Sequence, residues 1–511
     1  MKPLKFSPSL LRIGHLGGDR SNRQEGSSLF GDLGCIMFVS DNYKQLIDDG
    51  ALKIADTLYF KYLSPTDATT VVFEAIVNEN GLEIDGETFN PSTAAVKCVY
   101  ELFGSKIAIN GWLVWQNPQR LSLTQLLLQL RNSPIDEFDP SELVTTSPQH
   151  PLTRDVVFFL GAGVSIADGA PLQGTILPML YADQELNSAD ISDLKDVKAF
   201  LREFFNYKGE SENVPNLEYV FGFIDFFLSK GEALSAVYTL AMMAQLRESL
   251  IRYIHYIIAS CINQSSETLK RMIGQLYAKN TNVSIITLNY DTLFEDSFPE
   301  FFVLNYYYSF CYELINYDYE YLSPESWFIN PLKPLLTPSG STPHVLKLMK
   351  LHGSLNWLYC NVCNSLMVKL SNKETLLQSI LESTHSTTTD SNKCPRDGSV
   401  MRALITPPAY KKDLTHPVIT QLLIEAGHEV RAAKKVVFIG YSMPEADVHI
   451  KAILTRENLK NKEIIIINPF LDNACKRRYI QLNENAVFLE KTLENAIDDG
   501  ELLKLLQKPR T

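Results

Sequence analysis

Four short, continuous apolar runs constrain the fold more than any other feature of this 511-residue chain. They read RDVVFFLGAG from residue 154, VSIITLN from residue 283, KKVVFIGY from residue 434 and EIIIINP from residue 463. Strands that are apolar at every position are typical of a parallel sheet with both faces buried, and long helical stretches separate the strands here. The sequence therefore predicts an α/β fold in which helices cover both faces of a parallel sheet.

Composition shifts divide the chain into regions. Residues 132–153, with four Pro among Ser, Thr and Asp, are typical of a linker. After it we expect a Rossmann-like domain over 154–511, in which 176–280 form a helical insertion whose aromatic residues are core. Before it we expect a small α+β module over 51–131, and residues 1–50 are an unassigned N-terminal extension.

The small module carries several local signals. TTVVFEAIV alternates in polarity like a strand, and Asp85-Gly86 predicts a turn. PSTAAVKCVYELFG predicts a helix that stops at Gly104. Asn110-Gly111 stands between two apolar runs and predicts a β-hairpin.

Charge and composition exclude some classes of protein. The net charge is -12 and 45% of residues are hydrophobic, which disfavours a protein held on polyphosphate or on an anionic membrane. The N-terminus lacks the apolar stretch of a signal peptide, and no apolar run approaches the ~20 residues that span a bilayer. Eight scattered Cys indicate a reducing compartment. We expect a soluble, cytoplasmic protein without membrane contact.

A glycine-rich turn follows the first apolar strand. Gly161-Ala162-Gly163 would let the backbone approach a phosphate at the N-terminus of the next helix. The third glycine of the usual dinucleotide fingerprint is missing, so a plain tight turn is an equal alternative for this segment alone.

Five segments in order over about 154–490 resemble the sirtuin family. They are the loop GAGVSIADGAP, TLNYD at 287–291, KLHGS at 350–354, FIGYSM at 438–443 and IIIINP at 464–469. The resemblance implies NAD as substrate. The implied NAD-binding residues are Gly161, Ala162, Gly163, Ser165, Gly169, Pro171, Asn289, Asp291, Gly440, Ser442 and Asn468.

Three of the matched residues suit cleavage of the nicotinamide–ribose bond. Nicotinamide leaves NAD as a stable neutral group, so the reaction needs a fixed ribose and a positioned nucleophile more than a strong acid. Asn289 would hold ribose hydroxyls or a water, Asp291 would accept from the carboxamide, and His352 would be the general base. The alternative for each motif alone is structural: a helix cap at 289–291 and a hydrogen-bonded turn at His352.

Cysteine spacing raises the question of a metal. Cys360 and Cys363 have knuckle spacing, and Cys394 and Asp397 stand where the second Cys pair of the sirtuin zinc ribbon would lie. We therefore expect a structural zinc in a ribbon over 355–405. His385 is a substitute for the fourth ligand, and the alternative is the remnant of a lost site.

Departures from the sirtuin pattern bear on the reaction. Deacylases of that family pair a peptide with a phenylalanine-glycine-glutamate segment, where this chain reads LITPPAYKK. Pro407 and Pro408 cannot donate to such a ladder. The chain is more similar to the NAD-consuming sirtuin-like effectors of prokaryotic antiphage defence, which implies an NAD hydrolase. The alternatives are a protein deacylase or ADP-ribosyltransferase, and a non-catalytic sensor of NAD or ADP-ribose.

The N-terminal module resembles the RAMA domain, which is associated with restriction enzymes and adenine methylases. The matching residues are Phe89, Pro91, Ser92, Ala94, Asn110, Gly111, Trp112, Trp115 and Arg131. The resemblance implies sensing of modified DNA or of a protein trigger, and a homo-oligomer or a complex with other defence proteins. Six Lys or Arg against eight Asp or Glu in 51–131 predict weak phosphate affinity. The two tryptophans either stack on bases or fill the core.

Overall fold

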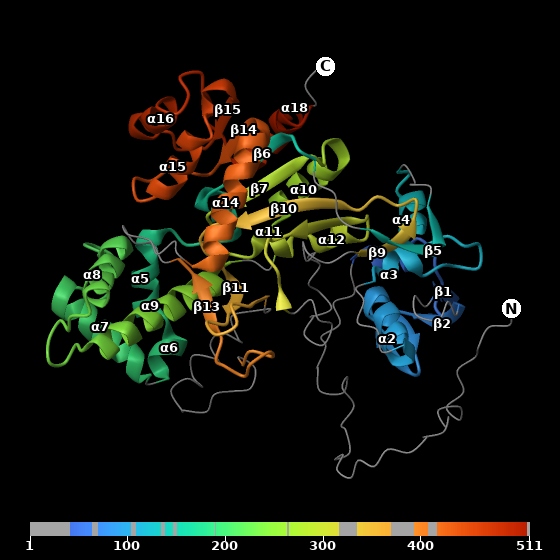
Figure 1. Ribbon diagram of the computed structural model, residues 1–511, viewed down its shortest axis with the longest axis horizontal. Coiled ribbons are helices and arrows are strands. Elements are labelled where there is room, and N and C mark those ends of the chain that lie inside the picture. Colours follow the sequence, from blue (N-terminus) through green and yellow to red (C-terminus); the bar gives the residue numbers. More distant parts are fainter. Residues whose placement is uncertain are drawn as a thin grey trace, which may run out of the picture. The chain divides into compact units, whose positions relative to one another are not determined.

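The chain folds into two compact units in the computed structural model (Figure 1). Unit 1 takes in Met1–Pro148, Phe302–Asn305 and Pro334–Pro343, and unit 2 takes in Gln149–Phe301, Tyr306–Lys333 and His344–Thr511. The structure describes residues 41–63, 70–103, 109–133, 138–146, 151–189, 191–262, 265–315, 335–368, 393–406 and 416–507.

Unit 2 is built on a seven-stranded sheet with the order β16-β15-β14-β6-β7-β10-β8, in which every neighbouring pair is parallel. The predicted Rossmann-like α/β fold class is confirmed. The strands are β6 (Arg154–Leu160), β7 (Val283–Thr287), β8 (Tyr306–Ser309), β10 (His344–Lys350), β14 (Ala433–Ile439), β15 (Glu463–Ile467) and β16 (Val487–Leu489).

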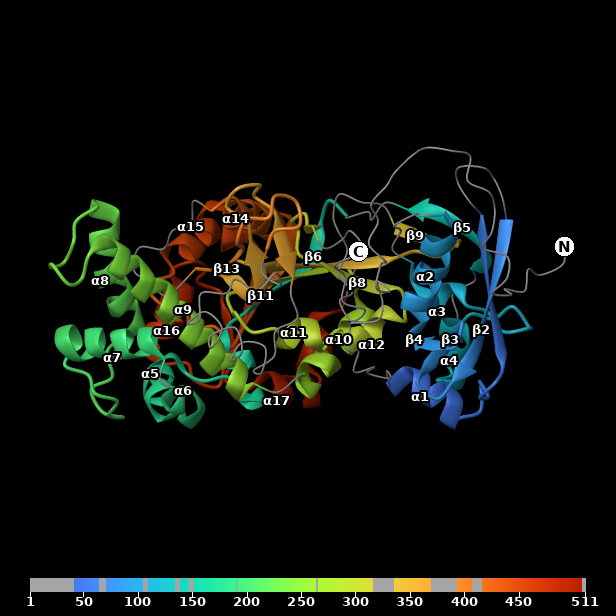
Figure 2. The ribbon, with the colours of Figure 1, turned by 90° about the horizontal axis from the view of Figure 1, so that it is seen from below.

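Burial on both faces explains why the central strands are apolar throughout. All five residues of β7 are buried, and so are the last five of β6. Figure 2 shows α14 (Pro417–Ala432) on one side of the sheet and α10 (Glu267–Lys279) and α17 (Leu493–Asp498) on the other. A strand covered on both sides has no polar face, so its sequence does not alternate.

A group of helices between β6 and β7 has its own core. Figure 1 shows α5–α9 gathered together, and their buried residues form a hydrophobic cluster separate from that of the sheet. α10 also lies between β6 and β7 in the sequence, but its buried residues belong to the core of the sheet. The helices are α5 (Gln173–Ala182), α6 (Gln184–Ser188), α7 (Ser192–Phe205), α8 (Leu217–Lys230) and α9 (Leu240–Cys261).

The predicted ribbon region forms a three-stranded sheet of order β12-β11-β13. These strands are β11 (Gly353–Tyr359), β12 (Leu366–Val368) and β13 (Arg402–Ile405). The remaining elements of this region of the chain are α11 (Leu293–Asp296), α12 (Pro299–Phe302), α15 (Val448–Arg456), α16 (Asn473–Ile480) and α18 (Glu501–Leu505). Among the helices that the structure describes, none is both long and apolar enough to cross a membrane.

Unit 1 is an α+β module, as predicted. Its antiparallel sheet has the order β1-β2-β3-β4, and Asp85 and Gly86 have φ of 54° and 83° at the predicted turn between β3 and β4. The elements are α1 (Asp41–Asp48), β1 (Thr57–Leu63), β2 (Thr70–Asn78), β3 (Gly81–Ile84), β4 (Glu87–Phe89), α2 (Pro91–Phe103), α3 (Gly111–Val114), α4 (Leu123–Leu130), β5 (Asp139–Thr146) and β9 (Leu335–Ser339).

Part of the predicted linker over 132–153 forms the strand β5. This strand pairs antiparallel with β9, which lies nearly 200 residues later, and the hydroxyl oxygens of Thr146 and Thr337 are 2.9 Å apart. A polar, Pro-containing segment can form a strand when a distant segment supplies its hydrogen bonds. The sequence around β5 does not indicate that β9 is its pairing strand.

The predicted hairpin at Asn110-Gly111 is also wrong. Asn110 caps α3, where its side-chain oxygen accepts a hydrogen bond from the Trp112 N–H at 3.1 Å. A Cβ at Gly111 would lie 2.0 Å from the Pro91 carbonyl oxygen, so close backbone packing requires this glycine. Asparagine is common both in turns and at the N-cap of helices, and here Asn110 is an N-cap residue. Gly104, the predicted helix stop, lies outside the described residues.

Both tryptophans of the RAMA-like segment are core residues. Trp112 and Trp115 are 5% and 0% exposed, and the Trp115 indole N–H donates to the Pro91 carbonyl at 2.8 Å. The Ser92 hydroxyl accepts from the Gly111 N–H at 2.9 Å. Hydrogen bonds thus link four of the matched residues, Pro91, Ser92, Gly111 and Trp115, and the tryptophan rings are not exposed for base stacking.

Candidate functional site

The predicted site residues follow the carboxyl ends of β6, β7, β10, β14 and β15. β7 lies on one side of β6 and β14 on the other, so the strand order reverses at this point. Ligands of open parallel sheets bind at such a reversal, outside the carboxyl ends of the strands. The fold therefore assembles these residues at the edge where a ligand site is expected.

The glycine loop packs against the loop after β14. A Cβ at Gly161 would lie 2.6 Å from the Gly440 carbonyl oxygen, and one at Gly163 would lie 2.7 Å from the Gly440 Cα. The Gly163 N–H donates to the Gly440 carbonyl at 2.9 Å. The two glycines are therefore required for backbone contact, while Ala162 and Gly163 remain exposed at the surface.

The next α-helix does not begin directly after the glycines. Two 3₁₀ turns, Ala162–Val164 and Ile166–Asp168, come first, and α5 begins only at Gln173. Gly169 has φ of 93°, and a Cβ there would lie 2.3 Å from the Cys261 carbonyl oxygen at the end of α9. This contact joins the loop to the helical group. Pro171 is half-buried, two residues before α5.

Ser165, Asn289 and Asp291 form one hydrogen-bonded cluster. The Ser165 hydroxyl donates to Asp291 Oδ2 at 2.8 Å, and Asn289 Nδ2 lies 3.1 Å from Ser165 Oγ and 3.1 Å from the Gly161 carbonyl oxygen. Ser165 is 1% exposed, whereas Asn289 and Asp291 are half-buried. Asp291 Oδ1 also accepts from the Leu293 N–H at 3.3 Å, which forms a local turn at the start of α11. The glycine loop and the TLNYD segment are thereby brought together.

His352 lies two residues beyond β10 and makes contacts that a simple turn would not need. Its Nε2 is 3.0 Å from His449 Nε2 and 3.9 Å from Asp447 Oδ1. The Tyr290 ring is 6.1 Å from the His352 ring, centroid to centroid, and the Tyr290 hydroxyl donates to the Thr406 carbonyl at 2.7 Å. Tyr290 therefore links the segment of Asn289 to His352.

Three neighbours of His352 were not predicted from the sequence: His449, Asp447 and Tyr290. The available signal was an Asp and a His two residues apart at the start of α15, the helix that follows β14. The sequence could not show that α15 turns this pair towards His352, which is 97 residues away.

A buried ion pair was also missed. Lys350 Nζ lies 2.6 Å from Glu295 Oε1, and the two side chains are 0% and 4% exposed. Lys350 also donates to the Asp291 carbonyl at 2.5 Å. Burial raises the pKa of Glu295 although Lys350 opposes the rise, and burial raises the pKa of Asp296 to about 7. Lys350 thus holds the backbone of the TLNYD segment through the Asp291 carbonyl.

The residues expected at the adenosine half lie after β14 and β15. Gly440 has φ of 60°, and its N–H donates to the Ile467 carbonyl at 2.9 Å. Ser442 is exposed, and its carbonyl accepts from the Arg478 guanidinium at 3.0 Å. Asn468 Oδ1 accepts from the Phe470 N–H at 3.0 Å, which closes a local turn. These residues share the sheet edge with the glycine loop.

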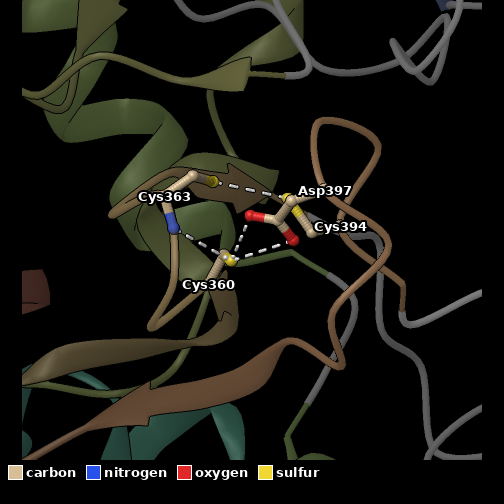
Figure 3. A group of neighbouring side chains, drawn as sticks. All are labelled: Cys360, Cys363, Cys394 and Asp397. Carbon is tan, nitrogen blue, oxygen red and sulfur yellow. Dashed lines mark hydrogen bonds between the residues drawn. The ribbon is translucent and has the colours of Figure 1, made fainter.

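The four predicted metal ligands converge (Figure 3). One donor atom from each of Cys360, Cys363, Cys394 and Asp397 lies within 4.8 Å of all the others. Cys363 Sγ is 3.5 Å from Cys394 Sγ, and Cys360 Sγ is 3.3 Å from Asp397 Oδ2. Tetrahedral zinc with bonds of about 2.3 Å to sulfur spaces its ligand atoms by about 3.8 Å. The donor set therefore fits a zinc ion, and His385 lies outside the described residues.

Hydrogen bonds prepare one thiol of this cluster for ionisation. Burial acts to raise the pKa of Cys360, but hydrogen bonds from the Cys363 N–H and the Ser399 hydroxyl outweigh burial and hold that pKa below its usual range. Burial raises the pKa of Cys394 to about 11. The described cysteines form no disulfide, so all three thiols are available as ligands.

Comparison with known proteins gives matches to solved structures alone. No known family profile matches the sequence, and no curated protein matches it significantly. A mutant Sir2 homologue in complex with ADP-ribose is 15% identical, with 69% of this chain and 92% of that chain covered and a TM-score of 0.32. A Sir2 homologue in complex with NAD is 13% identical, with 71% and 97% covered and a TM-score of 0.35. Sir2 bound to an acetylated peptide is 13% identical, with 68% and 94% covered and a TM-score of 0.30. Similarity of this degree establishes neither a family nor a function.

Proposed function

We propose that this protein is an NAD hydrolase that cleaves the nicotinamide–ribose bond. The observation that carries the proposal is the bridge from the Ser165 hydroxyl to both Asn289 and Asp291 at the reversal of the strand order. The sirtuin-like motifs of the sequence supply the same residues. His352 completes the set, because Tyr290 brings it next to the Asn289 segment.

The reaction consumes one water. The C1′–N bond of NAD breaks, its electron pair leaves with nicotinamide, and a water oxygen bonds to C1′. His352 accepts the proton that the water loses. Asn289 fixes the ribose hydroxyls or the water, and Asp291 accepts a hydrogen bond from the carboxamide. The exposed backbone at Ala162 and Gly163 faces the diphosphate.

The hydrogen bonds inside the cluster hold Asn289 in place. The Asn289 amide nitrogen is held by Ser165 and by the Gly161 carbonyl, which orients the side chain before substrate arrives. Positions that are preorganised in this way lose little entropy on binding. Ser165 is thus a positioning residue for Asn289 and Asp291.

We also propose a structural zinc at Cys360, Cys363, Cys394 and Asp397. When bound, the ion would join the knuckle after β11 to the turn before β13. A closed set of four ligands stabilises the fold and leaves no position for substrate, so this zinc has no part in the reaction.

The biological role that we propose is a regulated effector of prokaryotic antiphage defence. The sequence resemblance supports this role, since NAD loss harms the host and requires a trigger. Unit 1 would receive the trigger, either modified DNA or a protein, alone or within a homo-oligomer or a larger defence complex. Burial of Trp112 and Trp115 argues for a protein surface or a shape-based contact over base stacking on these rings.

The test follows nicotinamide release from NAD by the purified full-length chain, with and without an acetyl-lysine peptide. Release without peptide is expected, and His352→Ala or Asn289→Asp should reduce it by about 100-fold or more, the usual size of a lost general base. Asn289→Asp keeps the side-chain volume but turns a donor to the Gly161 carbonyl into an acceptor.

A matched control is His428→Ala, since His428 is exposed on α14 and pairs with Glu425 on the same helix. This variant should keep full activity. If nicotinamide release depends strictly on the peptide, the protein is a deacylase and not a hydrolase. If ADP-ribose is transferred to protein, it is a transferase. NAD binding without any release, in the presence of candidate triggers, would favour a sensor.

A further inference from the structure

A second cluster of metal-binding side chains lies outside the cysteine site. One donor atom from each of His352, Asp447 and His449 lies within 4.8 Å of the other two. The two Nε2 atoms are 3.0 Å apart, and Asp447 Oδ1 is 3.9 Å from His352 Nε2. Tetrahedral zinc with bonds of about 2.0–2.1 Å to nitrogen or oxygen spaces its ligands by about 3.3 Å. To reach that spacing the two imidazole nitrogens would move apart by about 0.3 Å, and the His352 nitrogen and the Asp447 oxygen would approach by about 0.6 Å.

Neighbouring groups already orient the carboxylate. The Tyr441 hydroxyl donates to Asp447 Oδ2 at 2.8 Å, while Oδ1 is the atom nearer to His352. The Asp447 N–H donates to the Pro444 carbonyl, and the Asp447 carbonyl accepts from the backbone of α15. Partners of this kind fix the direction of a metal ligand and raise the affinity of a site.

The chemical identity of the ligands indicates the class of ion. Two imidazole nitrogens with one carboxylate oxygen suit Zn²⁺ and related transition metals, whereas Mg²⁺ and Ca²⁺ prefer oxygen ligands alone. Asp447 and His352 are both 5% exposed, and His449 is half-buried, so the site is sheltered but has a side that solvent reaches.

We propose that His352, Asp447 and His449 bind a divalent transition-metal ion, with Zn²⁺ as the favoured ion, and that the bound ion suppresses NAD cleavage. The second half of this inference rests on the proposed hydrolase function. An imidazole nitrogen that is bonded to a metal cannot accept a proton, so occupancy removes the general base. The site would hold the enzyme inactive until the ion is withdrawn.

Metal binding is tested without NAD. The full-length protein is freed of loosely held metal with a mild chelator and titrated with Co²⁺ and then Zn²⁺. The cysteine site gives the intense near-ultraviolet bands of a thiolate ligand, and the histidine site does not, so the two sites are separated in one spectrum. We expect the protein to bind a second equivalent of Co²⁺ that gives no thiolate bands. The affinity for this second ion should fall at least about tenfold in His449→Gln and in Asp447→Asn.

Two further variants make the assignment specific. Cys394→Ser should remove the thiolate bands and leave the second equivalent intact. His428→Ala should leave the binding of both metal equivalents intact, because His428 is exposed on α14 and belongs to neither group of metal-binding side chains. An unchanged second equivalent in both His449→Gln and Asp447→Asn would refute the site, as would the lack of any second equivalent in the parent protein.

Regulation is tested by the ratio of nicotinamide release without and with Zn²⁺ at a concentration that fills the second site. We expect inhibition of at least about tenfold in the parent protein and a ratio near one in Asp447→Asn. Stimulation by Zn²⁺, or equal inhibition in Asp447→Asn, would overturn the inhibitory role. A parent protein that binds the second ion but releases no nicotinamide after its removal would contradict the hydrolase while the metal site stands.

Discussion

Replacement of Glu429 by Gln tests how helix α14 holds the sheet together. Glu429 accepts hydrogen bonds from Arg154 Nε at 2.6 Å, from Lys347 Nζ at 2.7 Å and from the Ser284 hydroxyl at 2.5 Å. These donors come from β6, β10 and β7, and Glu429 is 4% exposed. A single carboxylate thus ties three strands to one helix.

The pKa of Glu429 gives the size of the effect. Burial alone would raise this pKa, but Arg154 and Lys347 outweigh burial and lower it from 4.5 to about 2. That difference corresponds to about 3 kcal/mol of stability at neutral pH. A similar loss, about 3–5 kcal/mol, is typical when one partner of a buried ion pair is removed. We expect Glu429→Gln to lower the free energy of unfolding by about 3 kcal/mol at pH 7.

The pH dependence follows from the direction of the shift. Because the pKa is lower in the folded state, the contribution of Glu429 is complete above pH 4.5 and is lost as the pH falls from 4.5 through about 2. The difference in stability between the parent protein and Glu429→Gln should therefore narrow below pH 4.5.

Urea denaturation followed by tryptophan fluorescence, at pH 7 and at several lower values, measures both effects. The matched control is Glu425→Gln, since Glu425 lies one turn earlier on α14 and also contacts Lys347 at 2.5 Å, but its side chain is 26% exposed. Glu425→Gln should lower the free energy of unfolding by less than about 1 kcal/mol. Equal destabilisation by the two variants, or a change below about 0.5 kcal/mol for Glu429→Gln, would refute the reasoning.

Two more substitutions test the sheet edge and the cysteine cluster. Gly440→Ala places a side chain on a residue with φ of 60°, with its Cβ 2.6 Å from the Val164 nitrogen. The substitution should lower the free energy of unfolding, measured with heat or urea, by about 1–3 kcal/mol. Gly174→Ala, with nothing within 4 Å of its Cβ on α5, should be neutral or slightly stabilising. Cys394→Ser should abolish bound zinc in elemental analysis and lower the melting temperature, whereas Cys261→Ser should do neither.

Two outcomes would contradict these predictions. Equal stability of the two glycine variants would mean that the loops after β6 and β14 do not depend on close backbone contact. Full zinc content in Cys394→Ser would mean that this thiol is not a ligand.

Much of the fold could be predicted because burial leaves a local record. β6, β7, β14 and β15 are covered on both faces, so each is an unbroken apolar run. β10 was not among the predicted strands, because Lys347 and Lys350 interrupt its pattern. Their charges are compensated by Glu429 and Glu295, which a local pattern does not reveal.

The errors have a common physical cause. The Gly111 N–H donates to the Ser92 hydroxyl, and the Trp112 N–H donates to the Asn110 side chain that caps α3. The strand β5 forms only with β9, which lies nearly 200 residues later. The segment after Gly163 forms 3₁₀ turns before α5 begins, because the loop is held against Gly440. In each case a distant contact decided between conformations that the local sequence allowed equally.

By itself the sequence determined the class of the fold, the ends of the central strands and the residue types that stand there. Only the tertiary structure decided that Ser165 bonds to Asn289 and Asp291, that the cysteine pair meets Cys394 and Asp397, and that His352 faces His449. Periodicity reports which face of an element is buried, since neighbours along the chain share that environment. Hydrogen bonds and steric fit between residues 31 or more positions apart depend on how the elements pack, and no stretch of sequence encodes them alone.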